Sequence, residues 1–164
     1  MDLLNPSPAP TASSPDPTAG SAGAARQRTG RATAEYPEIA DQQGQVFTAA
    51  QARAGGWTAR QVQRRIDTGR WRRVAGRGFS HHPPPEGPEP PWRLAWAAHL
   101  TWPDVVIGGH VAAAIHGFPV PHDESVDVYT GRGRASGRRI RVRVASLEPD
   151  DILLIEPLLV TSAL

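Results

Sequence analysis

Two copies of the pattern Thr-x-x-Gln, at residues 48–51 and 58–61, constrain this chain more than any other feature. The pattern is a capping box: the threonine hydroxyl accepts a hydrogen bond from the backbone N–H three residues on, and the glutamine side chain reaches back to the threonine N–H. An aromatic residue, Phe47 or Trp57, precedes each threonine and suits the hydrophobic staple of a helix start. The sequence therefore predicts two short helices that begin at these threonines.

The segments around the second box predict a turn, a helix and a hairpin. The glycine pair at 55–56 suits the tight turn between two helices, where the backbone needs positive φ. The second helix is expected over 59–68, with Gly69 just beyond its C-cap. Residues 71–81 then read as a strand, a tip at Arg77 and a second strand. Two capped helices followed by a hairpin are typical of a winged helix-turn-helix.

Positive charge is concentrated in this region. Eight arginines and a single acid, Asp67, lie between Arg53 and Arg77. At 100° per residue, Ala59, Val62 and Ile66 share one helix face, which is expected to pack on the first helix. A basic helix beside a basic hairpin suits phosphate neutralisation and contact with a DNA groove.

The predicted DNA contacts fall into two groups. Arg60 and Arg64, opposite the apolar face of the helix, are the candidates for base edges in the major groove. The candidates for phosphates or the adjacent minor groove are Arg65, Arg72, Arg73 and Arg77. One such module buries little surface, so we expect a homodimer on an inverted repeat in double-stranded operator DNA.

The sequence is also compatible with alternatives to DNA binding. Arginines on an exposed helix face are often only solvated, and Gln61 serves as a cap rather than as a base reader. Winged helices also act as protein-interaction modules. A second basic stretch, 132–143, could widen the DNA footprint or bind an acidic partner. We favour a third interpretation, in which its arginines form the solvated side of an edge strand and protect that edge from aggregation by their charge.

Composition excludes several classes of site and location. The chain of 164 residues contains no cysteine, so disulfides and thiolate metal sites are excluded and a cytoplasmic location is expected. It also contains no lysine, which removes a P-loop lysine, a Schiff-base lysine and the usual lysine of metal-dependent nucleases. No apolar run reaches the roughly 18 residues of a membrane span, so we expect no membrane partner.

The fold class expected is α+β, in four segments. Residues 1–34, rich in Pro, Ala, Ser, Thr and Gly, are expected to be a disordered leader. Residues 35–82 form the winged helix-turn-helix, which opens with a short helix at 36–43. A proline-rich linker, 83–91, is expected to be stiff and extended. Residues 92–164 form a small α+β domain.

This second domain is predicted from short periodic segments. Its helices are expected at 92–101 and 110–116, and its strands at 105–107, 125–130, 139–144 and 152–155. In the strand 139–144, the valines and isoleucine at 140, 142 and 144 are expected to face inward and the arginines between them outward. The last apolar segments have little predicted structure to pack against, which favours a continuation of the chain or a partner protein.

A degenerate nucleotidyltransferase is the enzymatic alternative. Gly108-Gly109 before a helix, with Asp127-Val128-Tyr129 later, is similar to a transferase core in which an Asp-x-Asp pair holds magnesium. Here Tyr129 replaces the second acid, so we predict no enzyme activity, no catalytic residues, no metal and no cofactor. The histidine pair at 81–82 adjoins the proline linker and is interpreted as incidental.

Several segments together resemble the start of the AbiEi-type antitoxins. The matching segments are Gln43-Gly44-Gln45-Val46-Phe47-Thr48-Ala49-Ala50-Gln51-Ala52, Thr58-x-x-Gln61-Val62, Gly69-Arg70-Trp71-Arg72-Arg73-Val74-x-x-Arg77-Gly78-Phe79, Gly108-Gly109-His110-Val111-Ala112-Ala113-Ala114-Ile115-His116-Gly117 and Leu159-Val160-Thr161-Ser162. The resemblance covers about 43 to 164, and the order of the segments is more specific than any one of them.

The resemblance implies an N-terminal winged helix that binds operator DNA. It further implies a transcriptional repressor of its own type IV toxin–antitoxin operon, functionally linked to a nucleotidyltransferase-like toxin that it counters without stable binding. Many relatives continue past the Val-Thr-Ser segment, some into a nuclease-like domain. An intact antitoxin, a truncated relative with an incomplete second domain and a stand-alone regulator are all compatible with the sequence.

Overall fold

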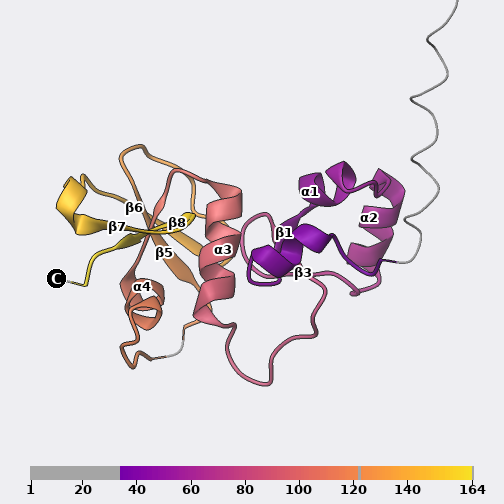
Figure 1. Ribbon diagram of the computed structural model, residues 1–164, viewed down its shortest axis with the longest axis horizontal. Helices are drawn as coiled ribbons and strands as arrows, with labels where there is room; N and C mark the ends of the chain where they lie inside the picture. Colours follow the sequence, from indigo (N-terminus) through magenta and orange to yellow (C-terminus); the bar gives the residue numbers. More distant parts are fainter. Residues whose placement is uncertain (1–33, 122, 164) are drawn as a thin grey trace, which may run out of the picture. The chain divides into compact units, whose positions relative to one another are not determined.

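The computed structural model describes residues 34–121 and 123–163, which form a mixed α+β structure with two sheets (Figure 1). The predicted leader lies outside the described residues, apart from Ala34. The elements of the first part are the 3-10 helix η1 (Glu38–Gln42), β1 (Phe47–Thr48), α1 (Ala49–Ala54), α2 (Ala59–Asp67), β2 (Arg72–Arg73) and β3 (Gly78–Ser80).

Both predicted capping boxes are formed. The Thr48 hydroxyl accepts from the Gln51 N–H at 3.1 Å, and the Gln51 side chain accepts from the Thr48 N–H at 2.9 Å. The corresponding distances for Thr58 and Gln61 are 3.2 and 2.7 Å. Because these bonds satisfy backbone groups that a helix start leaves free, α1 and α2 begin where the sequence predicts.

The predicted hairpin and a third strand form the first sheet. Its strand order is β1-β3-β2, with both pairs antiparallel. Phe79 of β3 lies opposite Phe47 on one side and Arg73 on the other. Beneath the sheet, Trp71 contacts the rings of Phe47 and Trp57 edge-on, with centroids 4.8 and 5.1 Å away.

Two local expectations for this part were met only in part. The short helix expected at 36–43 is present as the five-residue 3-10 helix Glu38–Gln42, which ends before Gly44 and Gln45, both with positive φ. On α2, Val62 is buried and Ile66 half-buried as expected, but Ala59 is exposed. Ala59 is the first residue of α2, one turn before the buried Val62, and does not reach the core.

The second part is built on a five-stranded sheet of order β6-β5-β4-β8-β7. Its elements are α3 (Pro91–Thr101), β4 (Val106–Gly108), α4 (Gly109–Ile115), β5 (Val126–Thr130), β6 (Ile140–Val144), the 3-10 turn η2 (Pro149–Asp151), β7 (Ile152–Ile155) and β8 (Leu158–Thr161). The β4–β8 and β5–β6 pairs are parallel, and the others are antiparallel. Helix α3 contacts β3, β5 and α4, and α4 also packs on β5.

The final apolar segment is an internal strand. β8 lies between β4 and β7, and its residues Leu158 and Val160 are buried in the core. For this segment the expectation of few packing partners was wrong, because a parallel partner, β4, lies about fifty residues earlier. The other late apolar segment, β7, pairs with β8 but leaves Leu153, Leu154 and Ile155 exposed.

The inward row predicted for the strand 139–144 holds only at its start. Ile140 is buried and Val142 half-buried, but Val144 is 66% exposed. Among the described strands, β6 pairs with β5 alone and forms an edge of the sheet, so its far end passes beyond the core. The prediction for Val144 was wrong because alternation shows which residues share a strand face but not how much of that face other elements bury.

The tip of the hairpin is packed against the second part of the chain. The Arg77 N–H donates to the Thr101 hydroxyl of α3 at 2.8 Å, and the Gly76 N–H donates to the Arg138 carbonyl at 3.0 Å. Gly76 has φ +47°, and a Cβ on it would overlap Thr101 and Ile140. The larger of two hydrophobic clusters joins Val46, Val74 and Ala75 to the second part, and the smaller surrounds Phe47, Trp71 and Phe79. Within residues 34–121 and 123–163, no helix combines the length and apolar character that a membrane crossing requires.

Candidate nucleic-acid interface

Three of the six predicted contact residues present unengaged guanidinium groups. Arg60 and Arg64 on α2, and Arg77 at the hairpin tip, are exposed. Within the described part of the chain their guanidinium groups make no hydrogen bond or ion pair, although the Arg77 backbone is anchored. Arg60 and Arg64 stand four residues apart and so point to the same side of the helix, away from buried Val62.

Arg73 is exposed but held along the hairpin. Its guanidinium lies 4.7 Å from the centroid of the Phe79 ring and donates to the Gly76 carbonyl. A cation over an aromatic face is attracted by the ring quadrupole, and the remaining N–H groups stay free for an anion. Arg73 is therefore a pre-positioned surface cation next to Arg77.

Arg65 is partly committed to the interior of the first part. Its guanidinium lies 4.3 Å from the Trp57 ring and 5.5 Å from the Trp71 ring, and it donates to the Glu35 carbonyl at 2.9 Å. Burial, and then the nearby charge of Arg70, lower the pKa of Arg65 from its usual value. An arginine stays charged under such a shift. Arg65 therefore stabilises the C-terminal half of α2 through these contacts, while its remaining N–H groups can still bind an anion.

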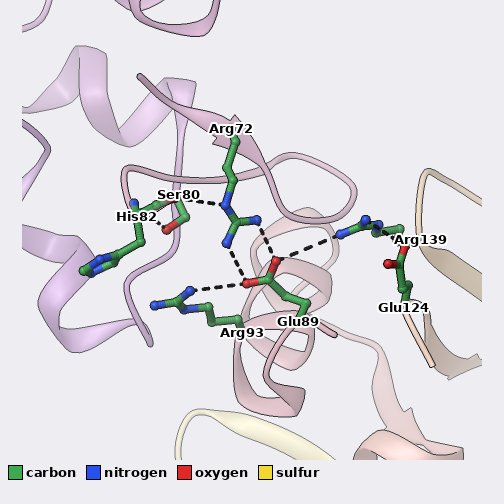
Figure 2. Close-up of polar contacts among 7 residues, drawn as sticks. All are labelled: Arg72, Ser80, His82, Glu89, Arg93, Glu124 and Arg139. Atoms are coloured by element: carbon green, nitrogen blue, oxygen red, sulfur yellow. Dashed lines mark hydrogen bonds and ion pairs between the residues drawn. The ribbon is translucent and has the colours of Figure 1, made fainter. Parts of the chain in front are cut away.

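Arg72 is engaged internally. Its Nη1 and Nη2 donate to the two carboxylate oxygens of Glu89 at 2.6 and 2.8 Å, and its Nε donates to the His82 carbonyl at 2.9 Å (Figure 2). This bidentate geometry is the strongest form of an arginine–carboxylate pair. Because every branch of the guanidinium has a protein partner, Arg72 offers no free donor to DNA.

Glu89 is the centre of a buried ionic cluster that sequence reasoning missed. Its side chain is 1% exposed, and besides Arg72 it meets Arg93 of α3 at 3.4 Å and Arg139 at 4.0 Å (Figure 2). Arg139 also donates to Glu124 at 2.8 Å. Glu89 lies in the segment interpreted as a plain proline linker, and a single acid among prolines carries no signal of such a role.

Burial and the arginines act in opposite directions on the pKa of Glu89. Removal from water alone would raise it, but the hydrogen bonds and charges of Arg72 and Arg93 prevail and hold the pKa below its usual value. Glu89 is therefore a carboxylate that its neighbours keep ionised. The residues it joins come from β2, from α3 and from the segment just before β6, so the cluster ties the hairpin to the second sheet.

The second basic stretch is largely paired with acids. Asp127 of β5 is buried and accepts from Arg141 and from Arg143, each at 2.9 Å. Arg141 also reaches Asp123, and Arg134 reaches Asp104. This arrangement agrees better with a charged edge strand than with a wider DNA footprint.

The same pairing bears on the transferase alternative. The Asp127 carboxylate faces two guanidinium groups, and His110 lies 4.0 Å from it. The Tyr129 ring packs directly on Gly108, at the turn where a transferase would place its glycine. Among the described residues no cluster of three or more histidine, cysteine, aspartate or glutamate side chains is arranged to hold a metal ion.

Comparisons of the chain with protein-family profiles, with curated proteins and with solved structures find no match.

Proposed function

We propose that this protein binds double-stranded DNA as a winged helix-turn-helix regulator, with α2 in the major groove and the β2–β3 hairpin as the wing. The observation that carries the proposal is the outer face of α2: Arg60 and Arg64 project from a capped helix with no acidic partner among the described residues. A buried inner face and a fixed start give that helix a defined orientation, which groove recognition requires.

The hairpin supports the same proposal. Arg73 and Arg77 add two exposed cations, and the tip that carries them is held by backbone hydrogen bonds to α3 and to Arg138. Phosphate contacts fix the register of a protein on a duplex, and base contacts specify sequence. In this scheme the hairpin and Arg65 hold phosphates, and Arg60 and Arg64 read base edges.

The regulatory context is proposed from the AbiEi-antitoxin resemblance. The protein represses its own operon as a homodimer on an inverted repeat, and counters a nucleotidyltransferase-like toxin without a stable complex. The proposal includes no transferase activity. In support, Asp127, the residue that would hold a transferase metal, accepts hydrogen bonds from Arg141 and Arg143 instead.

Substitution of Arg64 by alanine tests the base-reading role. Loss of a good bidentate base contact costs about 1–3 kcal/mol of binding free energy on the cognate operator and little on random duplex. The measurement is equilibrium binding of the full chain to both duplexes at one salt concentration. Arg53→Ala is the matched control, because Arg53 is exposed on α1 without a partner in the described residues. An equal loss on both duplexes would assign Arg64 to phosphate instead.

A further inference from the structure

A cavity of about 370 Å³ lies beside the C-terminal end of α2. It is bounded by the turn after α2, by the start of β2 and by the histidine pair that follows β3. The residues that matter in its lining are Glu35, Arg65, Arg70, Arg72, His81 and His82. The cavity thus combines three guanidinium groups and two imidazole rings with one acid.

Two of the three guanidinium groups are not neutralised by an ion pair. Arg72 is matched by Glu89, but Arg70 is exposed and makes no hydrogen bond or ion pair within the described chain. Arg65 uses Nη1 for the Glu35 carbonyl, which leaves its other N–H groups free. Even with the charge of Glu35 in the same lining, Arg65 and Arg70 leave the cavity wall with a net positive charge, which favours an anion.

Ring stacking and backbone hydrogen bonds hold His81 and His82 in place at the edge of the cavity. The His81 ring stacks flat on Tyr36, with centroids 3.6 Å apart and 8° between the planes. Its Nδ1 is buried without a hydrogen-bond partner among the described residues. The His82 backbone is fixed on both sides, since its N–H donates to Ser80 and its carbonyl accepts from Arg72.

We propose that this cavity binds a phosphate group, with Arg65 and Arg70 as its charged donors and the His81 and His82 rings beside it. A phosphate ester offers three strong acceptor oxygens and one to two negative charges, which suit two guanidinium forks. The volume exceeds that of a bare phosphate and leaves room for an attached sugar. The group comes either from the backbone of a bound duplex, which rests on the proposed function, or from a free nucleotide.

Titration of the full chain with inorganic phosphate and with thymidine 5′-monophosphate, followed through the NMR signals of the histidine rings, tests the site. We expect saturable shifts at His81 and His82, with affinity about tenfold weaker or worse in Arg70→Gln. Arg53→Gln should bind as the wild type does. No saturable shift with either probe, or equal affinity in Arg70→Gln, would overturn the proposal.

Duplex binding separates the two sources of phosphate. If a backbone phosphate occupies the cavity, Arg70→Gln lowers the salt slope of duplex affinity by about 1. If the slope is unchanged while phosphate binding is lost, the ligand is a free phosphate ester. A chain that saturates with phosphate but fails to bind any duplex would refute the DNA-binding proposal and leave the cavity site standing.

Discussion

Replacement of Glu89 by glutamine is expected to lower the free energy of unfolding by about 3–5 kcal/mol. Glutamine keeps the size of the side chain but removes its charge, so the guanidinium of Arg72, itself largely buried, loses its counter-ion. Removal of one partner from a buried pair is costly because the remaining charge is left without compensation. Chemical denaturation of both proteins, compared at one pH near neutrality, measures the difference.

Glu86→Gln is the matched control for this substitution. Glu86 lies three residues earlier in the same segment, is exposed, and has no partner within the described residues. Its replacement should change stability by less than about 0.5 kcal/mol. Equal effects at the two positions would show that the cluster around Glu89 contributes nothing specific.

The cost of Glu89→Gln should also depend on pH in one direction. The pKa of Glu89 in the folded protein lies below its usual 4.5, so its stabilising effect is complete above the unfolded pKa and is lost as pH falls through the folded pKa. The wild type and the variant should therefore converge in stability as the pH is lowered below the usual pKa of 4.5. A stability difference that stays constant into that acid range would contradict this account of the cluster.

Replacement of Trp71 by alanine is expected to cost about 3–5 kcal/mol, the range for a large buried aromatic side chain. Trp71 is 1% exposed, touches the rings of Phe47 and Trp57, and donates its indole N–H to the Glu35 carbonyl at 3.0 Å. Its loss opens a cavity beneath the first sheet and removes part of the support for Arg65. Thermal or chemical unfolding gives the magnitude.

Two further variants calibrate that result. Trp71→Phe keeps most of the ring but loses the hydrogen bond, so it should cost clearly less than alanine. Phe118→Ala removes an aromatic ring that is 52% exposed and should have little effect. If Trp71→Ala were as mild as Phe118→Ala, Trp71 would not be the centre of the hydrophobic cluster that it forms with Phe47 and Phe79.

The parts of the fold that depend on neighbouring residues could be predicted from the sequence. The two capping boxes fixed the starts of α1 and α2, and the glycine at 69 marked the end of α2. The hairpin was predicted from residues 71–81, which read as a strand, a tip at Arg77 and a second strand. Each of these features is encoded within about ten residues, where spacing and residue type determine the backbone directly.

Features that depend on distant segments could not be predicted. The pairing of β8 with β4 and the exposure of Val144 both follow from strand order, which a local period does not encode. The same holds for the charged residues. Nothing in the sequence near Arg64 and Arg72 distinguishes their environments. In the structure Arg64 is exposed on α2, whereas Arg72 pairs with Glu89, seventeen residues away.

The most direct test of the central claim is the salt dependence of duplex affinity for the full chain, measured by fluorescence anisotropy over a series of salt concentrations. Each neutralised phosphate contributes about −0.9 to the slope of log affinity against log salt. With Arg73 and Arg77 on phosphates, we predict a slope of about −2 or steeper, made shallower by Arg73→Ala/Arg77→Ala. A slope near zero, or one that this double variant leaves unchanged, would contradict DNA binding through α2 and the hairpin.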